Sequence, residues 1–160
     1  MSKNSIQHNH MLIRMETIKF PGINDISKVR KLMKKIVSDI DMKLLGTPHI
    51  YYVDTPIENK GITGTCSIQT SHLSFHIWET PEKGILENIN SNSLIQFDIY
   101  TCGNLTKNDA KLILENLSIY TPTRIDIDIL DRKKSLTLKY HSHWNYSTKS
   151  LFKDYVKNKF

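Results

Sequence analysis

A serine, a histidine and a cysteine in the middle of the chain have the side chains of a covalent mechanism. Ser71 offers a hydroxyl, His76 offers a base five residues later, and Cys102 offers a thiol. If residues 73–78 form a strand, His76 shares one face of it with Ser74. Seven histidines and two cysteines in 160 residues would place some such trio by chance. Taken singly, His76 is typical of a hydrogen-bonded strand residue and Cys102 of a small buried side chain.

The elements that must position these residues follow from the spacing of apolar side chains. Steps of three and four residues predict a helix from Ser27 to about Leu45. Thr106 with Asp109 resembles a capping pair at the start of a second helix. The predicted strands are Leu12–Phe20, His49–Val53, a pair of short strands within Gly61–Trp78, Leu94–Tyr100, Arg124–Leu130 and Ser135–Tyr140.

The order of these elements, β-α-β-β-β-β-α-β-β, favours an α+β fold. We expect a two-layer α/β sandwich, with a mainly antiparallel sheet and two helices on one face. The predicted boundaries are a flexible N-terminus at residues 1–11, one domain over 12–140, and a basic C-terminal extension at 141–160.

The basic character of the chain is concentrated at its C-terminal end. Residues 132–160 hold eight of the 22 Lys and Arg residues but only one of the 16 acidic residues. Basic residues interleaved with aromatic ones can bind single-stranded nucleic acid. The apolar residues of this segment also fit one helix face docked on the domain, which is the interpretation we favour. That face comprises Leu151, Phe152, Tyr155 and Val156.

Length and composition exclude several classes of protein. The length suits one domain, and 39% hydrophobic with 24% charged residues excludes intrinsic disorder. No apolar run approaches the roughly 20 residues that a membrane span needs. The N-terminus lacks the apolar core of a secretory signal, and two cysteines make no disulfide framework. We therefore expect a cytoplasmic protein that has neither a membrane nor nucleic acid as its partner.

Three separated motifs occur in order: GITG at 61–64, TSHLSFHIW at 70–78 and DIYTCG at 98–103. They resemble the prokaryotic S-adenosylmethionine decarboxylase family. Its pattern reads roughly G-[VI]-[ST]-G, then E-S-H-hydrophobic-x-x-H-T-W-P-E, then D-hydrophobic-[FY]-T-C-G. The resemblance covers about residues 12–133, and the predicted helices also fall where the family has them.

The resemblance implies that the chain makes its own cofactor, a pyruvoyl group, by cleaving itself between Thr70 and Ser71. The Ser71 hydroxyl would attack the Thr70 carbonyl and convert the peptide bond to an ester. His76 would assist removal of the Ser71 α-proton, and Thr63 would hydrogen-bond the processing intermediate. The ester then breaks by β-elimination, and loss of ammonia leaves the pyruvoyl group at the start of the 71–160 fragment. A strained turn at the cleavage site would help this reaction.

The resemblance also implies the reaction that follows. The enzyme would be a lyase that converts S-adenosylmethionine to its decarboxylated form for spermidine biosynthesis. The pyruvoyl carbonyl would form a Schiff base with the substrate amine and act as the electron sink. Cys102 would protonate the α-carbon, since a thiol with a pKa of about 8.5 is mostly protonated at neutral pH. No added cofactor or metal ion would be needed. The family works as a homodimer whose active sites draw residues from both chains.

The sequence departs from the family pattern around the second motif. Thr70 stands where the family has Glu before the cleavage serine. Thr80 stands where the family's Glu binds the ribose hydroxyls, and Glu79 or Glu82 are candidates to replace it. An inserted loop at 79–93 makes the link to the third motif about eleven residues longer, which costs little free energy. Such a loop could form a lid over the site.

The aromatic contact to adenine is also displaced. Ile57 is in register with the family's stacking Phe, so Tyr51 and Tyr52 are the candidates for this role.

Two alternatives to this function stay open from the sequence. The same pyruvoyl chemistry could act on arginine or ornithine, which a carboxylate placed for a guanidinium or ammonium group would favour. The chain could instead be an unprocessed, non-catalytic homologue that acts as a binding or regulatory subunit. The Ser-His-Cys set argues against that second alternative, and Thr70 argues for it.

Overall fold

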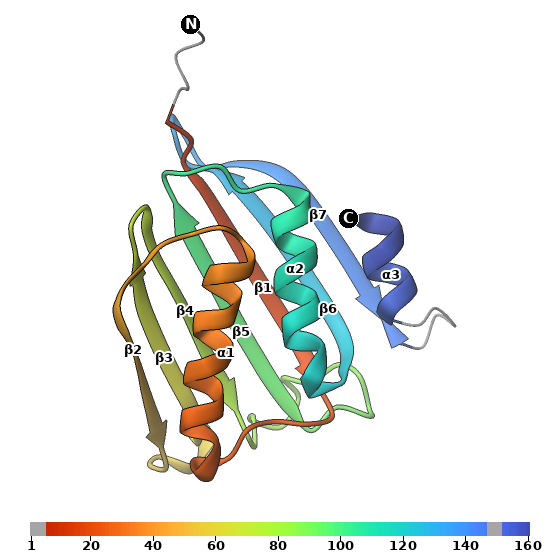
Figure 1. Cartoon of the computed structure of the whole chain (residues 1–160). Coiled ribbons are helices and arrows are strands. Elements are labelled where there is room, and N and C mark those ends of the chain that lie inside the picture. The colour runs from red at the N-terminus through yellow and green to blue at the C-terminus, as the bar shows by residue number, and fades with distance from the viewer. Residues whose placement is uncertain (1–5, 147–151) are drawn as a thin grey trace, which may run out of the picture.

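The computed structural model describes residues 6–146 and 152–160 and is built on one seven-stranded sheet (Figure 1). The order across the sheet is β2-β3-β4-β5-β1-β6-β7, and all neighbouring strands are antiparallel. The first strand of the chain therefore lies inside the sheet, between β5 and β6. The strands are β1 (Asn9–Thr17), β2 (Leu44–Val53), β3 (Gly61–Ile68), β4 (Ser71–Trp78), β5 (Ser93–Thr101), β6 (Pro122–Asp131) and β7 (Thr137–Asn145).

Helices cover one face of this sheet, which confirms the predicted fold class (Figure 1). Helices α1 (Ile26–Asp39) and α2 (Lys107–Leu117) lie across its middle, and α3 (Phe152–Lys159) lies beside β7. Strand alternation turns the apolar side chains toward these helices. The core formed there includes Met11, Ile13, Met15, Val29, Met33, Leu73, Phe97, Ile99, Ile113, Ile125 and Ile127.

The two predicted helices form, with one correction at an end. Thr106 caps α2 in the predicted way, because its hydroxyl accepts from the Asp109 backbone N–H and the Asp109 carboxylate accepts from the Thr106 backbone N–H. The first helix ends at Asp39 instead of near Leu45. Asp41 turns the chain there with a φ of 53°, and β2 already begins at Leu44 rather than at His49.

The sheet is longer at both ends of the chain than predicted. β1 begins at Asn9 because it pairs with β5 from Asn9 to Thr17, so the predicted flexible segment 1–11 is too long. β7 runs to Asn145 because it pairs with β6 along almost its whole length. Residues 141–145 therefore belong to the sheet and not to a separate extension.

The predicted apolar face of the last segment docks on β7. The Trp144 ring lies 5.4 Å from the Phe152 ring, and the Tyr155 hydroxyl donates to Ser142 Oγ at 2.8 Å. Tyr155 and Val156 are buried, so the docked helix is confirmed for these residues. Leu151 lies outside the described residues.

The face of the sheet opposite α1 and α2, called here the open face, carries mostly polar side chains. Cross-strand pairing sets a row of Tyr51, Thr63, His76, Gln96, Arg14, Asp126 and His143 across it. A second row comprises His49, Thr65, Ser74, Asp98, Leu12, Asp128 and His141.

The inserted loop covers one end of the open face. Glu16 of β1 lies beneath it, fully buried, and accepts from the backbone N–H groups of Glu87 and Asn88 and from Ser91 Oγ. Burial alone would raise the pKa of Glu16, but these hydrogen bonds and one from Arg14 outweigh it and hold that pKa below its usual value. A buried carboxylate therefore anchors the insertion. Within the described part of the chain, no helix is both long and apolar enough to cross a membrane.

Candidate active site

The hairpin turn between β3 and β4 holds the backbone strain that the sequence analysis expected. β3 ends at Ile68 and β4 begins at Ser71, so the turn consists of Gln69 and Thr70. Ser71 has a φ of 153°, a region that is essentially restricted to glycine. For a residue with a side chain, this conformation costs of the order of 1–3 kcal/mol. The strain falls on the residue whose amide nitrogen belongs to the Thr70–Ser71 peptide.

The end of β5 clamps this peptide from the side. The Cys102 backbone N–H donates to the Thr70 carbonyl oxygen at 2.9 Å, and the Thr101 hydroxyl donates to Thr70 Oγ1 at 2.8 Å. Gly103 packs closely at this contact, because a Cβ there would lie 3.1 Å from Thr101 Oγ1 and 3.4 Å from Thr70 Cγ2. The third motif thus holds the second in a fixed position. Thr70, the departure from the family pattern, takes part in the clamp through its hydroxyl.

Cys102 lies beside this turn in a half-buried setting. Its Sγ is 3.8 Å from His8 Nδ1 and 4.0 Å from the Tyr100 hydroxyl. His8 Nδ1 in turn lies 2.8 Å from that hydroxyl, and Arg132 lies over the Tyr100 ring. The other cysteine, Cys66, is buried on the helix side, where burial raises its pKa to about 11. Of the two thiols, Cys102 is therefore the one placed for chemistry.

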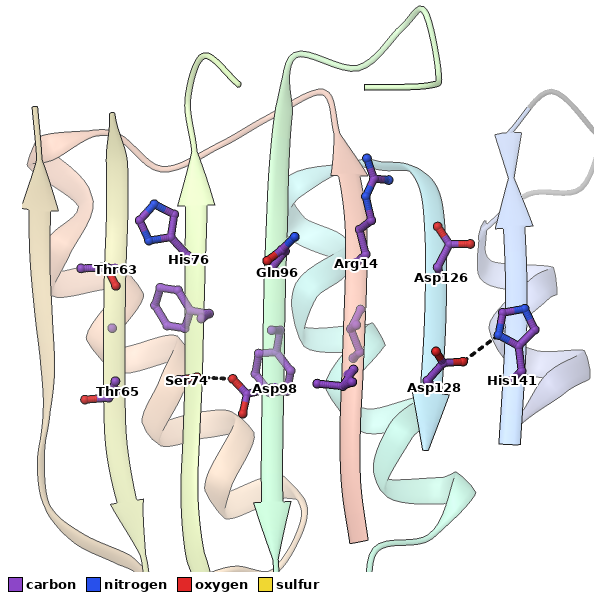
Figure 2. Close-up of a pocket in the computed structure, with 15 residues that line it drawn as sticks. Arg14, Thr63, Thr65, Ser74, His76, Gln96, Asp98, Asp126, Asp128 and His141 are labelled. Carbon is purple, nitrogen blue, oxygen red and sulfur yellow. Dashed lines mark hydrogen bonds and ion pairs between the residues drawn. The ribbon is translucent and has the colours of Figure 1, made fainter. Parts of the chain in front are cut away.

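His76 and Thr63 form a second group, directly opposite each other on β4 and β3 (Figure 2). The His76 ring packs on Trp78 with 3.9 Å between ring centroids. Burial lowers the pKa of His76, and this outweighs the nearby Asn59 backbone, which raises it. Among the described residues, the buried His76 Nε2 has no hydrogen-bond partner. Burial thus disfavours the charged form of the His76 ring, and its Nε2 is unpaired in the described part of the chain.

The two groups lie at opposite ends of β4. Ser71 and His76 are five residues apart on the strand, a separation of about 17 Å at 3.4 Å per residue. The structure therefore brings Thr70, Ser71 and Cys102 together, and Thr63 with His76, but it does not bring His76 to Ser71 within one chain.

A cavity of about 780 Å³ lies on the open face (Figure 2), and its lining includes Thr63 and His76 but not Ser71 or Cys102. Thr63 and His76 line one side of it, and Asp126 and Asp128 of β6 line the other. Asp98 lies between them and accepts a hydrogen bond from Ser74 (Figure 2). Further lining residues include Arg14, Thr65, Gln96 and His141.

Sequence reasoning missed the acidic side of this cavity. Alternation along the predicted strand Arg124–Leu130 puts Asp126 and Asp128 on one face, but by itself it does not mark that face as part of a site. The signal that could have found the site is that Gln96 and Asp98 alternate in the same way on β5. Which strands are neighbours in the sheet is not visible in either pattern.

The predicted substrate contacts do not converge on the cavity. Tyr52 packs against the core on the helix side and donates to Glu79 Oε2 at 3.0 Å. Glu79 is itself buried, with Lys60 Nζ 3.6 Å from the same oxygen. Thr80 and Glu82 are exposed in the loop, and none of these four residues lines the cavity. Tyr51 is on the open face opposite Thr63, exposed, and also outside the lining.

Comparison of the sequence with known proteins points to one protein family. Residues 9–133 match the sequence model of the family described as S-adenosylmethionine decarboxylase. The chain belongs to this family.

Two curated relatives are named S-adenosylmethionine decarboxylase proenzyme. The one from Persephonella marina is 28% identical over 77% of this chain and 80% of its own length. The one from Archaeoglobus fulgidus is 29% identical over 77% of this chain and 95% of its own length. Both identities are low, so the chain is a divergent member. A solved structure described as a phage SAM lyase in complex with S-methyl-5'-thioadenosine has a TM-score of 0.40 and 10% identity, over 94% of this chain and 98% of that one.

Proposed function

We propose that this protein is a self-processing adenosylmethionine decarboxylase that cleaves its own chain between Thr70 and Ser71. The observation that carries the proposal is the strained Ser71, whose preceding carbonyl is held by the Cys102 N–H. Strain raises the free energy of the intact peptide, so a reaction that breaks it starts closer to its transition state. The word proenzyme in the relatives' names also supports a chain that is processed.

The Cys102 N–H has a direct role in the first step. When the Ser71 hydroxyl attacks the Thr70 carbonyl carbon, negative charge develops on the Thr70 oxygen. The Cys102 N–H already lies 2.9 Å from that oxygen and would stabilise the charge, as an oxyanion-hole donor does. The product of this step is an ester with a free amine on Ser71.

The second step needs a base at the Ser71 α-carbon, and His76 of the same chain is too far away. We propose that a homodimer supplies it, with the open faces of two chains packed together around a two-fold axis. Such an axis can set the Ser71 end of one sheet near the His76 end of the other. The low pKa of His76 keeps its imidazole neutral, as a base must be, and Thr63 lies beside it. Proton removal would break the Ser71 Cβ–Oγ bond, and water would then release ammonia.

The residues present fit a pyruvoyl group made in this way, since Ser71 has both the hydroxyl and the strained backbone that its formation requires. Once formed, the group supplies a carbonyl electron sink for the loss of carbon dioxide. The Cys102 thiol would donate its proton to the substrate α-carbon. The cavity would bind S-adenosylmethionine, whose amine and sulfonium are cationic, beside Asp98, Asp126 and Asp128. Its decarboxylated product would serve spermidine biosynthesis.

A decarboxylation assay with Cys102→Ala tests the reaction and the role of the thiol together. The substitution keeps the backbone N–H that contacts Thr70, so self-cleavage should continue. Release of carbon dioxide from carboxyl-labelled S-adenosylmethionine should fall by about 10²- to 10⁴-fold, because the general acid is lost. Cleaved wild-type protein that releases carbon dioxide from arginine or ornithine, and not from S-adenosylmethionine, would contradict the proposed substrate.

A further inference from the structure

We propose that His72, oriented by Asp98, is the base that takes the Ser71 hydroxyl proton when the peptide becomes an ester. The inference rests on the proposed self-cleavage and assigns a residue to its first step. His76 would serve the second step, about 17 Å away along β4 in the same chain.

The contacts of Ser71 carry this assignment. Ser71 Oγ lies 3.1 Å from His72 Nδ1, within hydrogen-bond distance. On the far side of the ring, His72 Nε2 lies 4.0 Å from Asp98 Oδ2. Ser74, which is opposite Asp98 in the sheet, donates to Asp98 Oδ1 and fixes the carboxylate. Serine, histidine and aspartate thus follow one another in the order needed to activate a hydroxyl.

The Asp98 carboxylate, 4.0 Å from His72 Nε2, acts on the imidazole through its charge rather than through a hydrogen bond, and that charge favours a proton on Nε2. With its proton on Nε2 toward Asp98, neutral His72 presents an unprotonated Nδ1 to the Ser71 hydroxyl. Asp98 also stabilises the imidazolium that forms when Nδ1 gains a proton.

The other charged and titratable groups around this array come from β1, β5 and the segment after β6. His10 Nε2 lies 3.2 Å from Asp98 Oδ2, the oxygen that faces His72. The Tyr100 ring packs 5.9 Å from the His72 ring, and Arg132 lies over that same Tyr100 ring.

The proposed step conserves atoms and protons. The Ser71 Oγ–H proton moves to His72 Nδ1 as the Oγ–C bond to the Thr70 carbonyl carbon forms. The C–N bond between Thr70 and Ser71 then breaks, and the proton on Nδ1 passes to the Ser71 nitrogen. No oxidant, reductant or water is consumed, because the peptide and the ester are isomers.

Hydroxylamine distinguishes this step from the later elimination, because it cleaves an ester but leaves a peptide intact. His72→Gln should slow self-cleavage by about 10²- to 10⁴-fold. Hydroxylamine should release fragments from it at the same reduced rate, since the ester forms slowly. His76→Gln should accumulate the ester, and hydroxylamine should then release a 71–160 fragment that still begins with serine. Denaturing mass spectrometry separates that fragment from the pyruvoyl form, which is lighter by one ammonia.

A matched control and chemical rescue separate catalysis from structure. His143 pairs with Asp126 on the same face at 2.7 Å but does not contact Ser71, so His143→Gln should cleave at the wild-type rate. Asp98→Asn should be slowed as well. Should His72→Gln fold poorly, added imidazole should restore cleavage to His72→Ala.

Two results would overturn the assignment while wild-type protein cleaves itself: His72→Gln that cleaves at the wild-type rate, or His72→Gln that yields hydroxylamine fragments as fast as His76→Gln does. Wild-type protein that never cleaves would instead refute the proposed function itself.

Discussion

At the scale of the residue, one serine combines a nucleophile with a strained backbone. A φ of 153° at Ser71 suits glycine, yet glycine has no hydroxyl to attack the preceding carbonyl. The strain is held in place by the clamp from Thr101 and Cys102 on Thr70. Folding free energy is therefore stored at the one peptide that the proposed reaction breaks.

Two substitutions of this serine measure the stored strain. Ser71→Ala and Ser71→Gly both lack the hydroxyl, so both should remain uncleaved. Ser71→Gly should be the more stable of the two by about 1 kcal/mol or more, because glycine adopts this φ without steric cost. Urea unfolding of the two intact chains gives the difference directly. Equal stability, or a more stable alanine variant, would show that Ser71 is unstrained.

At the scale of the element, the predictable parts were those with a local signal. The Thr106 cap, the paired strands β3 and β4 and the strand β6 each have a signal in neighbouring residues, and all three were predicted. The end of α1 was wrong because its apolar spacing continues through Ile40 to Leu44, beyond the turn at Asp41.

The same distinction holds within the candidate site. The motifs pointed to Ser71, His76 and Cys102 without needing the sheet order. The order of strands, which no local pattern encodes, puts β5 beside β4, so that Asp98 lies opposite Ser74 and 4.0 Å from His72. Glu79 was a candidate contact to the substrate ribose, but its carboxylate faces Tyr52 and Lys60 instead. A buried carboxylate needs polar partners, and these partners are distant in the sequence.

The inserted loop depends on Glu16, and its stability should follow the charge of that residue. Glu16→Gln removes a carboxylate that accepts several hydrogen bonds, so unfolding free energy at pH 7 should fall by about 1–3 kcal/mol. The folded-state pKa of Glu16 is below its unfolded value, so its contribution is present above the unfolded pKa and is lost as pH falls through the folded one. Denaturant unfolding from pH 7 to pH 3 should show the two proteins converging.

The control for this experiment is Glu87→Gln on the same loop. Glu87 forms an exposed ion pair with Arg124, and its loss should change stability by less than about 1 kcal/mol. A difference between wild type and Glu16→Gln that grows toward acid pH would contradict the role assigned to the buried carboxylate.

At the scale of the whole molecule, one sheet holds both halves of a site that cannot meet within it. Ser71 and Cys102 lie where β4 begins and β5 ends, and His76 with Thr63 lie toward the other end of β4. β7 and α3 lie beyond the matched residues 9–133, and β7 widens the sheet on the side of β6. The polar open face, with its cavity, is the surface that a second copy would cover.

Mixing two inactive chains tests whether the site is shared. Ser71→Ala and His76→Gln should each fail to complete processing alone. When they are co-expressed, the intact Ser71 of one chain meets the intact His76 of the other in mixed dimers. With random pairing, about half of the His76→Gln chains should then become cleaved, and the Ser71→Ala chains should stay whole. No cleavage in a mixture shown to contain mixed dimers would mean that His76 does not act across the interface.

The most direct test of the whole account is the intact mass of purified wild-type protein under denaturing conditions. We predict two species, residues 1–70 and a 71–160 fragment lighter by one ammonia than the serine-started chain. A single full-length chain that persists through long incubation would contradict self-cleavage, and with it the proposed pyruvoyl-dependent decarboxylase.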